Sequence, residues 1–152
     1  MSILPYMING NLCLHMALTQ ETTLSNFPQY FYKLRFLDQL VDYLKKFEDQ
    51  IFVLGGDFNV GPYPKDIYIK GYEGIAGSQR ERDAIAKIRD AGFKDMLPDS
   101  GFKNNGFRLD HFYMNECTQK IFTDGKVLLD IRELERPSDH APIMCEVEIP
   151  NS

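Results

Sequence analysis

The chain has 152 residues, of which 43% are hydrophobic, 26% charged and 12% aromatic. This composition is typical of one soluble globular domain and excludes a disordered chain, a collagen-like repeat and a disulfide scaffold. No apolar run approaches the roughly 20 residues of a membrane span, and no secretory signal pattern is visible. The net charge of −5 disfavours a protein that coats DNA through a basic surface. It is compatible with a metal-dependent nuclease, because such sites are built from carboxylates.

The N-terminal half of the chain alternates between irregular and regular segments. Residues 1–29 mix polar and apolar residues without a period, and we expect them to be irregular. Residues 30–49 predict a helix, because its apolar residues recur at helical spacing. The apolar run 51–54 indicates a buried strand that ends at Gly55 and Gly56. Residues 78–91 predict a second helix that begins with a capping box of Ser78 and Glu81.

Strands dominate the C-terminal part. We expect strands at residues 107–115, 126–131 and 141–149, and the last of these alternates between apolar and polar residues. The whole pattern predicts a mixed α/β layer structure in which the chemistry lies at strand ends. Three well-separated cysteines, Cys13, Cys117 and Cys145, indicate reduced thiols and a cytoplasmic location.

Two short polar stretches at predicted strand ends could carry chemistry. Asp57 and Asn59 follow the first buried strand and could face one cleft, or they could simply hydrogen-bond their own turn. Arg108 and Asp110 share one face of a strand, and the simpler interpretation is an exposed ion pair.

A third polar stretch, Pro137 to Pro142, is a tight turn before the last strand. It places His140 beside Asp139, where the ring could transfer a proton or stabilise an anion. A capped turn with a solvated histidine is equally compatible. His15 and His111 have no evident partners. Zinc-binding and nucleotide-binding motifs do not occur in the sequence.

Together, these stretches resemble the exonuclease III type of apurinic/apyrimidinic endonuclease, within the endonuclease/exonuclease/phosphatase superfamily. The matching segments are GGDFNV (55–60), NNGFRLDHFYMN (104–115) and RPSDHAPI (136–143), in the order of that family, with weaker matches in YKLRFLDQLVDYL (32–44) and YMING (6–10). The resemblance implies one truncated domain over residues 1–152, with its family-like core in residues 30–149. It also implies the C-terminal half of a four-layer α/β/β/α sandwich, in which a mixed sheet is flanked by helices.

The resemblance also implies residue roles and a cofactor. Asp57 would orient or deprotonate the attacking water, and Asn59 would hold the scissile phosphate. His140 would contact that phosphate while Asp110 orients the ring. Mg²⁺ or Mn²⁺ would be held by Asp139, Asp57 and Asn59. Tyr6 would be the active-site phenol, and the substrate would be DNA with abasic sites or 3′ ends.

Departures from the family leave alternatives open. The family's N-terminal half, with its metal-binding glutamate, has no counterpart here, and the chain between Asp95 and Asn104 is shortened. Half a sandwich would expose an apolar sheet face, so we expect a partner, which could be a second copy or a separate N-terminal half. The alternatives are an inactive remnant, a split subunit, or a phosphatase that acts on a different phosphoester.

Overall fold

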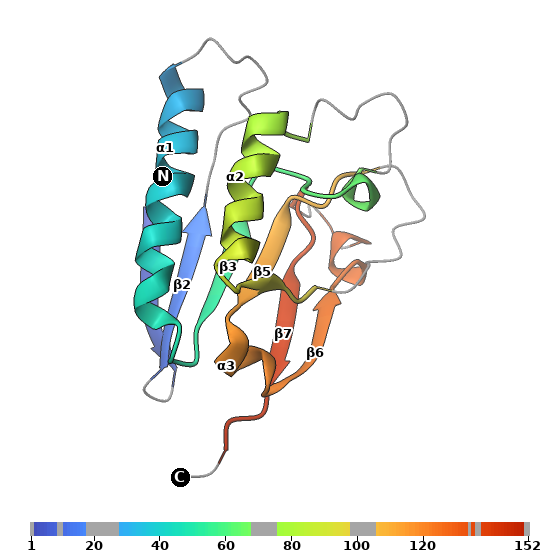
Figure 1. The fold of residues 1–152 in the computed structure, drawn as a ribbon. Coiled ribbons are helices and arrows are strands. Elements are labelled where there is room, and N and C mark those ends of the chain that lie inside the picture. The colour runs from blue at the N-terminus through green and yellow to red at the C-terminus, as the bar shows by residue number, and fades with distance from the viewer. Residues whose placement is uncertain are drawn as a thin grey trace.

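The computed structural model describes residues 2–8, 11–17, 28–67, 76–97, 106–133, 135 and 138–150, and for residues 2–17 it describes the backbone alone. Helices are interspersed among the strands along the chain (Figure 1). In chain order they are β1 (Ser2–Ile8), β2 (Asn11–Ala17), α1 (Pro28–Leu44), β3 (Val53–Asp57), α2 (Gln79–Asp90), β4 (Lys94–Asp95), β5 (Asp110–Met114), α3 (Glu116–Gln119), β6 (Phe122–Val127) and β7 (Ile143–Val147). Short 3₁₀ helices occur at Lys45–Phe47, Pro64–Asp66 and Asp130–Glu133.

Five strands form the main sheet in the order β1-β2-β3-β5-β4. Only the β2–β3 pair is parallel, and the other neighbours are antiparallel. Within the β3–β5 pair, Leu54 lies opposite Tyr113 and Asp57 lies opposite Asp110. Because the two strands run in opposite directions, the last residue of β3 meets the first residue of β5. This register brings two carboxylates to one end of the sheet.

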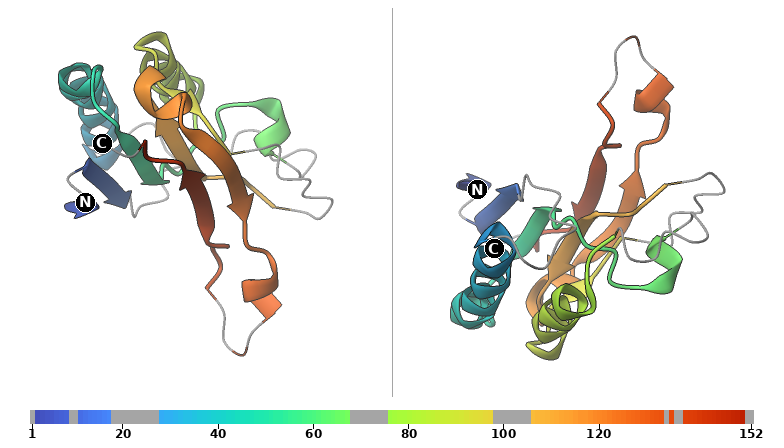
Figure 2. Two further views of the ribbon diagram at one scale, coloured as in Figure 1. Left: turned by 90° about the horizontal axis from the view of Figure 1, so that it is seen from below. Right: turned by 90° about the horizontal axis from the view of Figure 1, so that it is seen from above.

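Helices α1 and α2 cover one face of this sheet (Figures 1 and 2). Residues on these helices, on β3 and β5 and in the connecting segments form one buried core: Leu37, Leu40, Leu44, Phe52, Leu54, Phe58, Val60, Ala84, Ile85, Ile88, Phe93 and Tyr113. The predicted capping box of α2 is confirmed, since the Glu81 amide donates to Ser78 Oγ at 3.3 Å and the Ser78 amide donates to Glu81 Oε2 at 2.7 Å. None of the described helices is long and apolar enough to cross a membrane.

Strands β6 and β7 form a separate two-stranded sheet on the opposite side of the main sheet from the helices (Figure 2). Val53 and Phe112 alternate with the core residues of β3 and β5, so they face this second side, and both are only half-buried. The apolar residues of β7 are also half-buried, and Ile149 beyond it is 37% exposed. The observed architecture is therefore the predicted α/β class, with a sandwich face that the described residues cover only in part.

Several predicted segments need correction. The expectation that residues 1–29 are irregular is wrong for residues 2–8 and 11–17, because β2 pairs with β3 and β1 pairs with β2 through backbone hydrogen bonds. Pro5 lies in the edge strand β1, where a missing N–H is tolerated. The strand expected at 126–131 lies at 122–127, where it pairs with β7. The helix predicted to reach residue 49 ends at Leu44 and continues as a 3₁₀ turn.

The first buried strand also extends further than predicted, through both glycines to Asp57. A Cβ on Gly55 would overlap the ring of Phe112 on the neighbouring strand β5. Glycine here therefore permits a close cross-strand approach rather than ending the strand. As a consequence, Asp57 is held by the sheet itself and not by a loop.

Candidate active site

Asp57 and Asn59 form a tight turn at the end of β3. The two oxygens of the Asp57 carboxylate accept hydrogen bonds from Asn59, Oδ1 from the main-chain amide at 2.8 Å and Oδ2 from the side-chain Nδ2 at 2.7 Å. Asn59 has a φ of 50°, in the left-handed region that asparagine tolerates better than most residues. The interpretation of this stretch as a self-bonded turn is confirmed, and the turn also fixes the direction of the Asp57 carboxylate.

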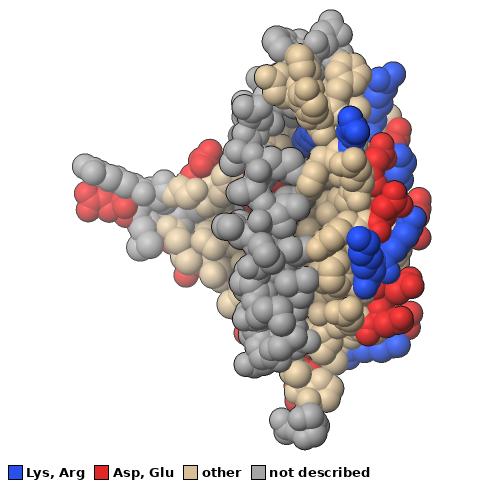
Figure 3. All heavy atoms as spheres, turned by 90° about the vertical axis from the view of Figure 1, so that its left-hand side faces the viewer, with Lys and Arg blue, Asp and Glu red and all other residues tan. Residues whose placement is uncertain are grey.

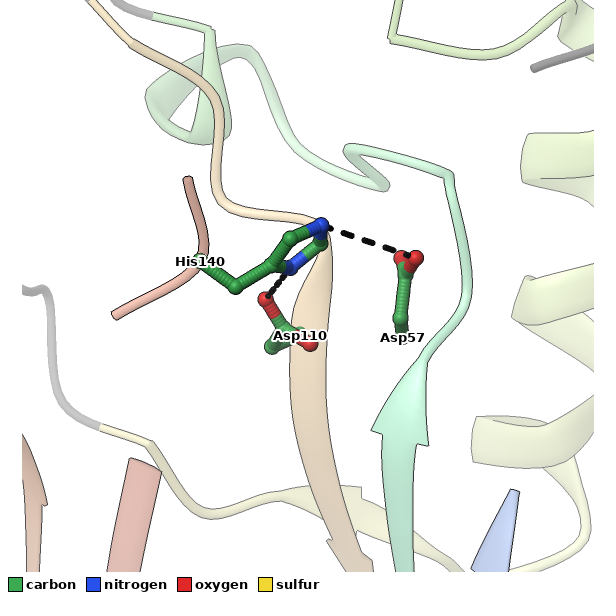
Figure 4. Close-up of side chains that lie close together, drawn as sticks. All are labelled: Asp57, Asp110 and His140. Atoms are coloured by element: carbon green, nitrogen blue, oxygen red, sulfur yellow. Dashed lines mark hydrogen bonds and ion pairs between the residues drawn. The ribbon is translucent and has the colours of Figure 1, made fainter. Parts of the chain in front are cut away.

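His140 lies beside this turn, although it is 83 positions further along the chain. Its Nδ1 lies 2.7 Å from Asp110 Oδ2 and its Nε2 lies 4.0 Å from Asp57 Oδ2. Figure 4 shows the ring between the two carboxylates, with Asp57 at the end of β3 and Asp110 at the start of β5. The His140 amide donates to Ser138 Oγ at 3.1 Å, so the turn is capped as the simpler interpretation predicted. The histidine is nevertheless paired, which a merely solvated ring would not be.

The charges of these groups depend on one another. The hydrogen bond that His140 donates to Asp110 is the main reason why the pKa of His140 is raised above its usual value, and the negative charges of Asp110, Asp57 and Asp139 add to it. The pKa of Asp57 is also raised, chiefly by burial and secondarily by the charge of Asp110. The hydrogen bond from Asn59 and the positive charges of His140 and Lys33 oppose this rise. The site therefore combines a carboxylate whose pKa is raised with a histidine whose raised pKa favours the cationic form.

The donor set is compatible with a divalent cation. One ligand atom from each of Asp57, Asp110 and His140 lies within 4.8 Å of the other two. His140 Nδ1 faces Asp110, and a protonated ring cannot ligate a metal, so the carboxylates are the suitable donors. Mg²⁺ prefers oxygen ligands and retains several waters. The described residues thus fit a cation with few protein ligands, and the remaining positions need water, substrate or another chain.

Two other predicted site residues, Asp139 and Tyr6, are not part of the group formed by Asp57, Asp110 and His140. Asp139 is exposed beside His140 and is outside the group of possible ligands formed by Asp57, Asp110 and His140. Tyr6 lies on β1, where the pairing of β1, β2 and β3 places its backbone level with Val53. That row is four residues before Asp57, or about 13 Å along the strand. The described backbone therefore does not bring Tyr6 to the end of the sheet where Asp57 lies.

A second polar cluster was not predicted from the sequence. Arg108 is buried just before β5, and it donates from Nε to Asp66 Oδ1 and from a terminal nitrogen to Asp95 Oδ2, both at 2.7 Å. His111 is fully buried, with Nδ1 2.9 Å from the same Asp95 oxygen and Nε2 3.1 Å from the Val60 carbonyl. The interpretation of Arg108 and Asp110 as an exposed ion pair is therefore wrong. No local sequence pattern indicated this cluster, because its members lie far apart in the chain, at Asp66, Asp95 and Arg108.

The sequence and the fold can be compared with those of known proteins. No family model matches the chain. Exodeoxyribonuclease III of Haemophilus influenzae is 29% identical over 147 residues, covering 75% of this chain and 53% of that protein. A solved 3′ phosphatase from Neisseria, bound to a product DNA hairpin, has a TM-score of 0.84 and 23% identity. An AP endonuclease from Archaeoglobus fulgidus has a TM-score of 0.82 and 24% identity.

The resemblance to the exonuclease III type of endonuclease is confirmed. The two solved structures match 97% of this chain but only 65% of their own chains. The chain spans about half the length of the curated relative it matches. The similarity therefore covers one part of these proteins, as the motif positions predicted.

Proposed function

We propose that this chain carries the water-activating and phosphate-binding groups of a metal-dependent DNA phosphodiesterase. The main support is the convergence of Asp57, Asp110 and His140 from three separate segments at one end of the sheet. Similarity to exodeoxyribonuclease III over part of its length supports the same class of reaction.

Each residue has a role that follows from its surroundings. Asp57 accepts the proton of the attacking water, because its raised pKa makes the carboxylate a better base. His140 acts as an imidazolium that donates to a phosphate oxygen and offsets the negative charge of the transition state. Asp110 is a positioning residue, since it fixes the ring through Nδ1 and leaves Nε2 directed towards Asp57. Asn59 fixes the Asp57 carboxylate, and it also contacts the scissile phosphate.

Mg²⁺ or Mn²⁺ would be held chiefly by Asp57, with Asn59 and the exposed Asp139 as the further predicted ligands. When bound, the cation supplies positive charge against the phosphate and the leaving oxygen. Because few protein oxygens are available among the described residues, affinity for the cation should be weak in the isolated chain.

The proposed substrate is duplex DNA with an abasic site or a modified 3′ end. The helical layer does not suit DNA binding, because Lys and Arg side chains are interspersed with Asp and Glu along it (Figure 3). One example is the pair of Lys87 on α2 and Asp38 on α1. Binding to a phosphate backbone favours a surface of one positive sign. We therefore place the DNA at the end of the sheet that carries His140.

The active unit includes a further segment that covers the second face of the main sheet. This proposal is supported by the half-buried Val53 and Phe112, the half-buried β7, and the partial coverage of the relatives. The covering part is a second copy of this chain or a segment that corresponds to the remaining length of the relatives. The alternative function, an inactive or split subunit, is favoured by the same observations.

The test is cleavage of duplex oligonucleotides that carry either one abasic site or a 3′-phosphate. Each is incubated with Mg²⁺, Mn²⁺ or a chelator, and light scattering measures the oligomeric state. We expect metal-dependent release of product that Asp57→Asn and His140→Gln abolish. The control Asp124→Asn, an exposed carboxylate on β6, should leave it unchanged. A monomer that neither cleaves DNA nor binds Mn²⁺ would support the inactive or split subunit instead.

A further inference from the structure

Lys33 is a buried lysine on α1, with its side chain only 8% exposed. Lysine is among the residues least often buried, because removing an ammonium from water is costly unless it is paired. Its Nζ lies 2.7 Å from Glu81 Oε1, and it also donates to the main-chain carbonyl of Asn59 at 3.2 Å. This ammonium therefore joins a buried carboxylate on α2 to the turn that forms the candidate site.

The turn needs such a partner because its backbone is strained. Asn59 is the only residue other than glycine with a positive φ among the described residues, and this region disfavours L-residues. The same conformation directs both donors of Asn59 towards Asp57. If Asn59 relaxed to an ordinary φ, the carboxylate would lose these two hydrogen bonds and its fixed direction.

Glu81 makes this connection rigid. Its Oε1 contacts Lys33 while its Oε2 accepts from the Ser78 amide at the start of α2. Ser78 is in turn held by Tyr30 on α1, with 2.8 Å between the two side-chain oxygens. Both helices and the capping residue thus fix Nζ in place, and Nζ fixes the carbonyl of Asn59.

We propose that Lys33 is a positioning residue that holds Asn59 in its left-handed conformation and so directs the Asp57 carboxylate. Its side chain acts through the main chain of Asn59, without contacting substrate. The structural part of this inference is independent of the proposed function, and only its kinetic consequence rests on that function.

The primary test is nuclear magnetic resonance of the full chain with Lys33→Met, which keeps an unbranched side chain of similar length but removes the charge. We expect the carbon shifts of Asn59 to move away from left-handed values and its side-chain amide to lose protection from solvent exchange. Lys87→Met is the matched control, because that lysine also joins α1 and α2 but is 56% exposed. A folded Lys33→Met protein with unchanged Asn59 signals would overturn the proposal.

Removing Lys33 alone leaves Glu81 buried without a counter-charge, which could unfold the protein. A second variant therefore combines Lys33→Met with Glu81→Gln, so that neither position carries a buried charge and the amide oxygen can still accept from Ser78. The Asn59 signals should change in this protein as well, and wild-type signals there would equally refute the proposal. Glu81→Gln alone retains the Lys33 donor and should leave Asn59 close to wild type.

A kinetic measurement separates a positioning role from a purely structural one. If the wild-type chain, alone or assembled, cleaves DNA, the double variant should lose kcat on the order of tenfold to a hundredfold with little change in KM. Unchanged kcat in the folded variant would contradict the inference. If the wild type does not cleave, the proposed function fails, and the resonance experiment still decides the role of Lys33.

Discussion

Replacement of Arg108 by methionine tests whether the second polar cluster stabilises the fold. The guanidinium is 4% exposed and bonds to Asp66 and Asp95, whose side chains are 1% and 4% exposed. Removing one partner of a buried ion pair typically costs about 3–5 kcal/mol, because the other charge stays buried. Two features favour the lower end of this range. Asp66 and Asp95 keep hydrogen bonds from the Tyr63 amide and His111, and the buried NH1 atom of Arg108 has no hydrogen-bond partner among the described residues.

Urea unfolding provides the measurement. A loss of about 3 kcal/mol divided by a slope of about 2 kcal/mol per molar shifts the midpoint by roughly 1.5 M. The control Lys87→Met breaks an exposed ion pair and should change the free energy of unfolding by less than about 0.5 kcal/mol. Adding Asp66→Asn and Asp95→Asn to Arg108→Met should restore part of the loss, because no uncompensated carboxylate then remains. A shift for Arg108→Met no larger than the control would refute the reasoning.

The same cluster predicts a pH dependence. Burial acts to raise the pKa of Asp95, but the hydrogen bonds and charges of His111 and Arg108 outweigh it and lower the pKa. A lowered folded-state pKa stabilises the protein above the unfolded value of about 3.9, and this stability is lost as the pH falls through the folded value. The urea midpoint should therefore decrease below about pH 4, and less steeply in Arg108→Met. Equal slopes in the two proteins would contradict this assignment.

Three further predictions concern the site and the strand that carries it. Asp110→Asn should lower the pKa of His140, because the hydrogen bond that the ring donates to Asp110 is the main cause of its rise. A proton resonance titration of the imidazole would detect this change, and an unchanged midpoint would count against the pairing. In the wild type, the contribution of His140 to stability is present below about pH 6.5 and is lost as the pH rises through its higher folded-state pKa. The urea midpoint should therefore decrease over the same rise in pH. Gly55→Ala should destabilise the fold by about 1–3 kcal/mol, because the new Cβ overlaps the ring of Phe112. Adding Phe112→Leu to Gly55→Ala should recover part of this loss. If the single and the double variant lose the same free energy of unfolding, the overlap is refuted.

The sequence by itself determined the α/β class, both long helices and the segments that carry the site. Periodic apolar residues specify α1 because helix packing repeats every three to four residues, and the capping box specifies the start of α2 because its hydrogen bonds are local. The motifs around Asp57, Asp110 and His140 indicated the resemblance to the exonuclease III type of endonuclease in the same way, as short patterns read along the chain. Local chemistry is therefore sufficient for such features.

Only the tertiary structure decided which distant residues meet. In residues 2–17, β2 forms by pairing with β3 and β1 by pairing with β2, and neither has much local signal, so the sequence favoured irregular structure there. Likewise, the antiparallel register of β3 and β5 places Asp57 opposite Asp110, and the fold then brings His140 between them. Lys33 and Arg108 resembled ordinary surface charges in the sequence, but the structure buries both against carboxylates. Burial and long-range pairing depend on the whole chain, because the free energy of a charge is set by the groups packed around it.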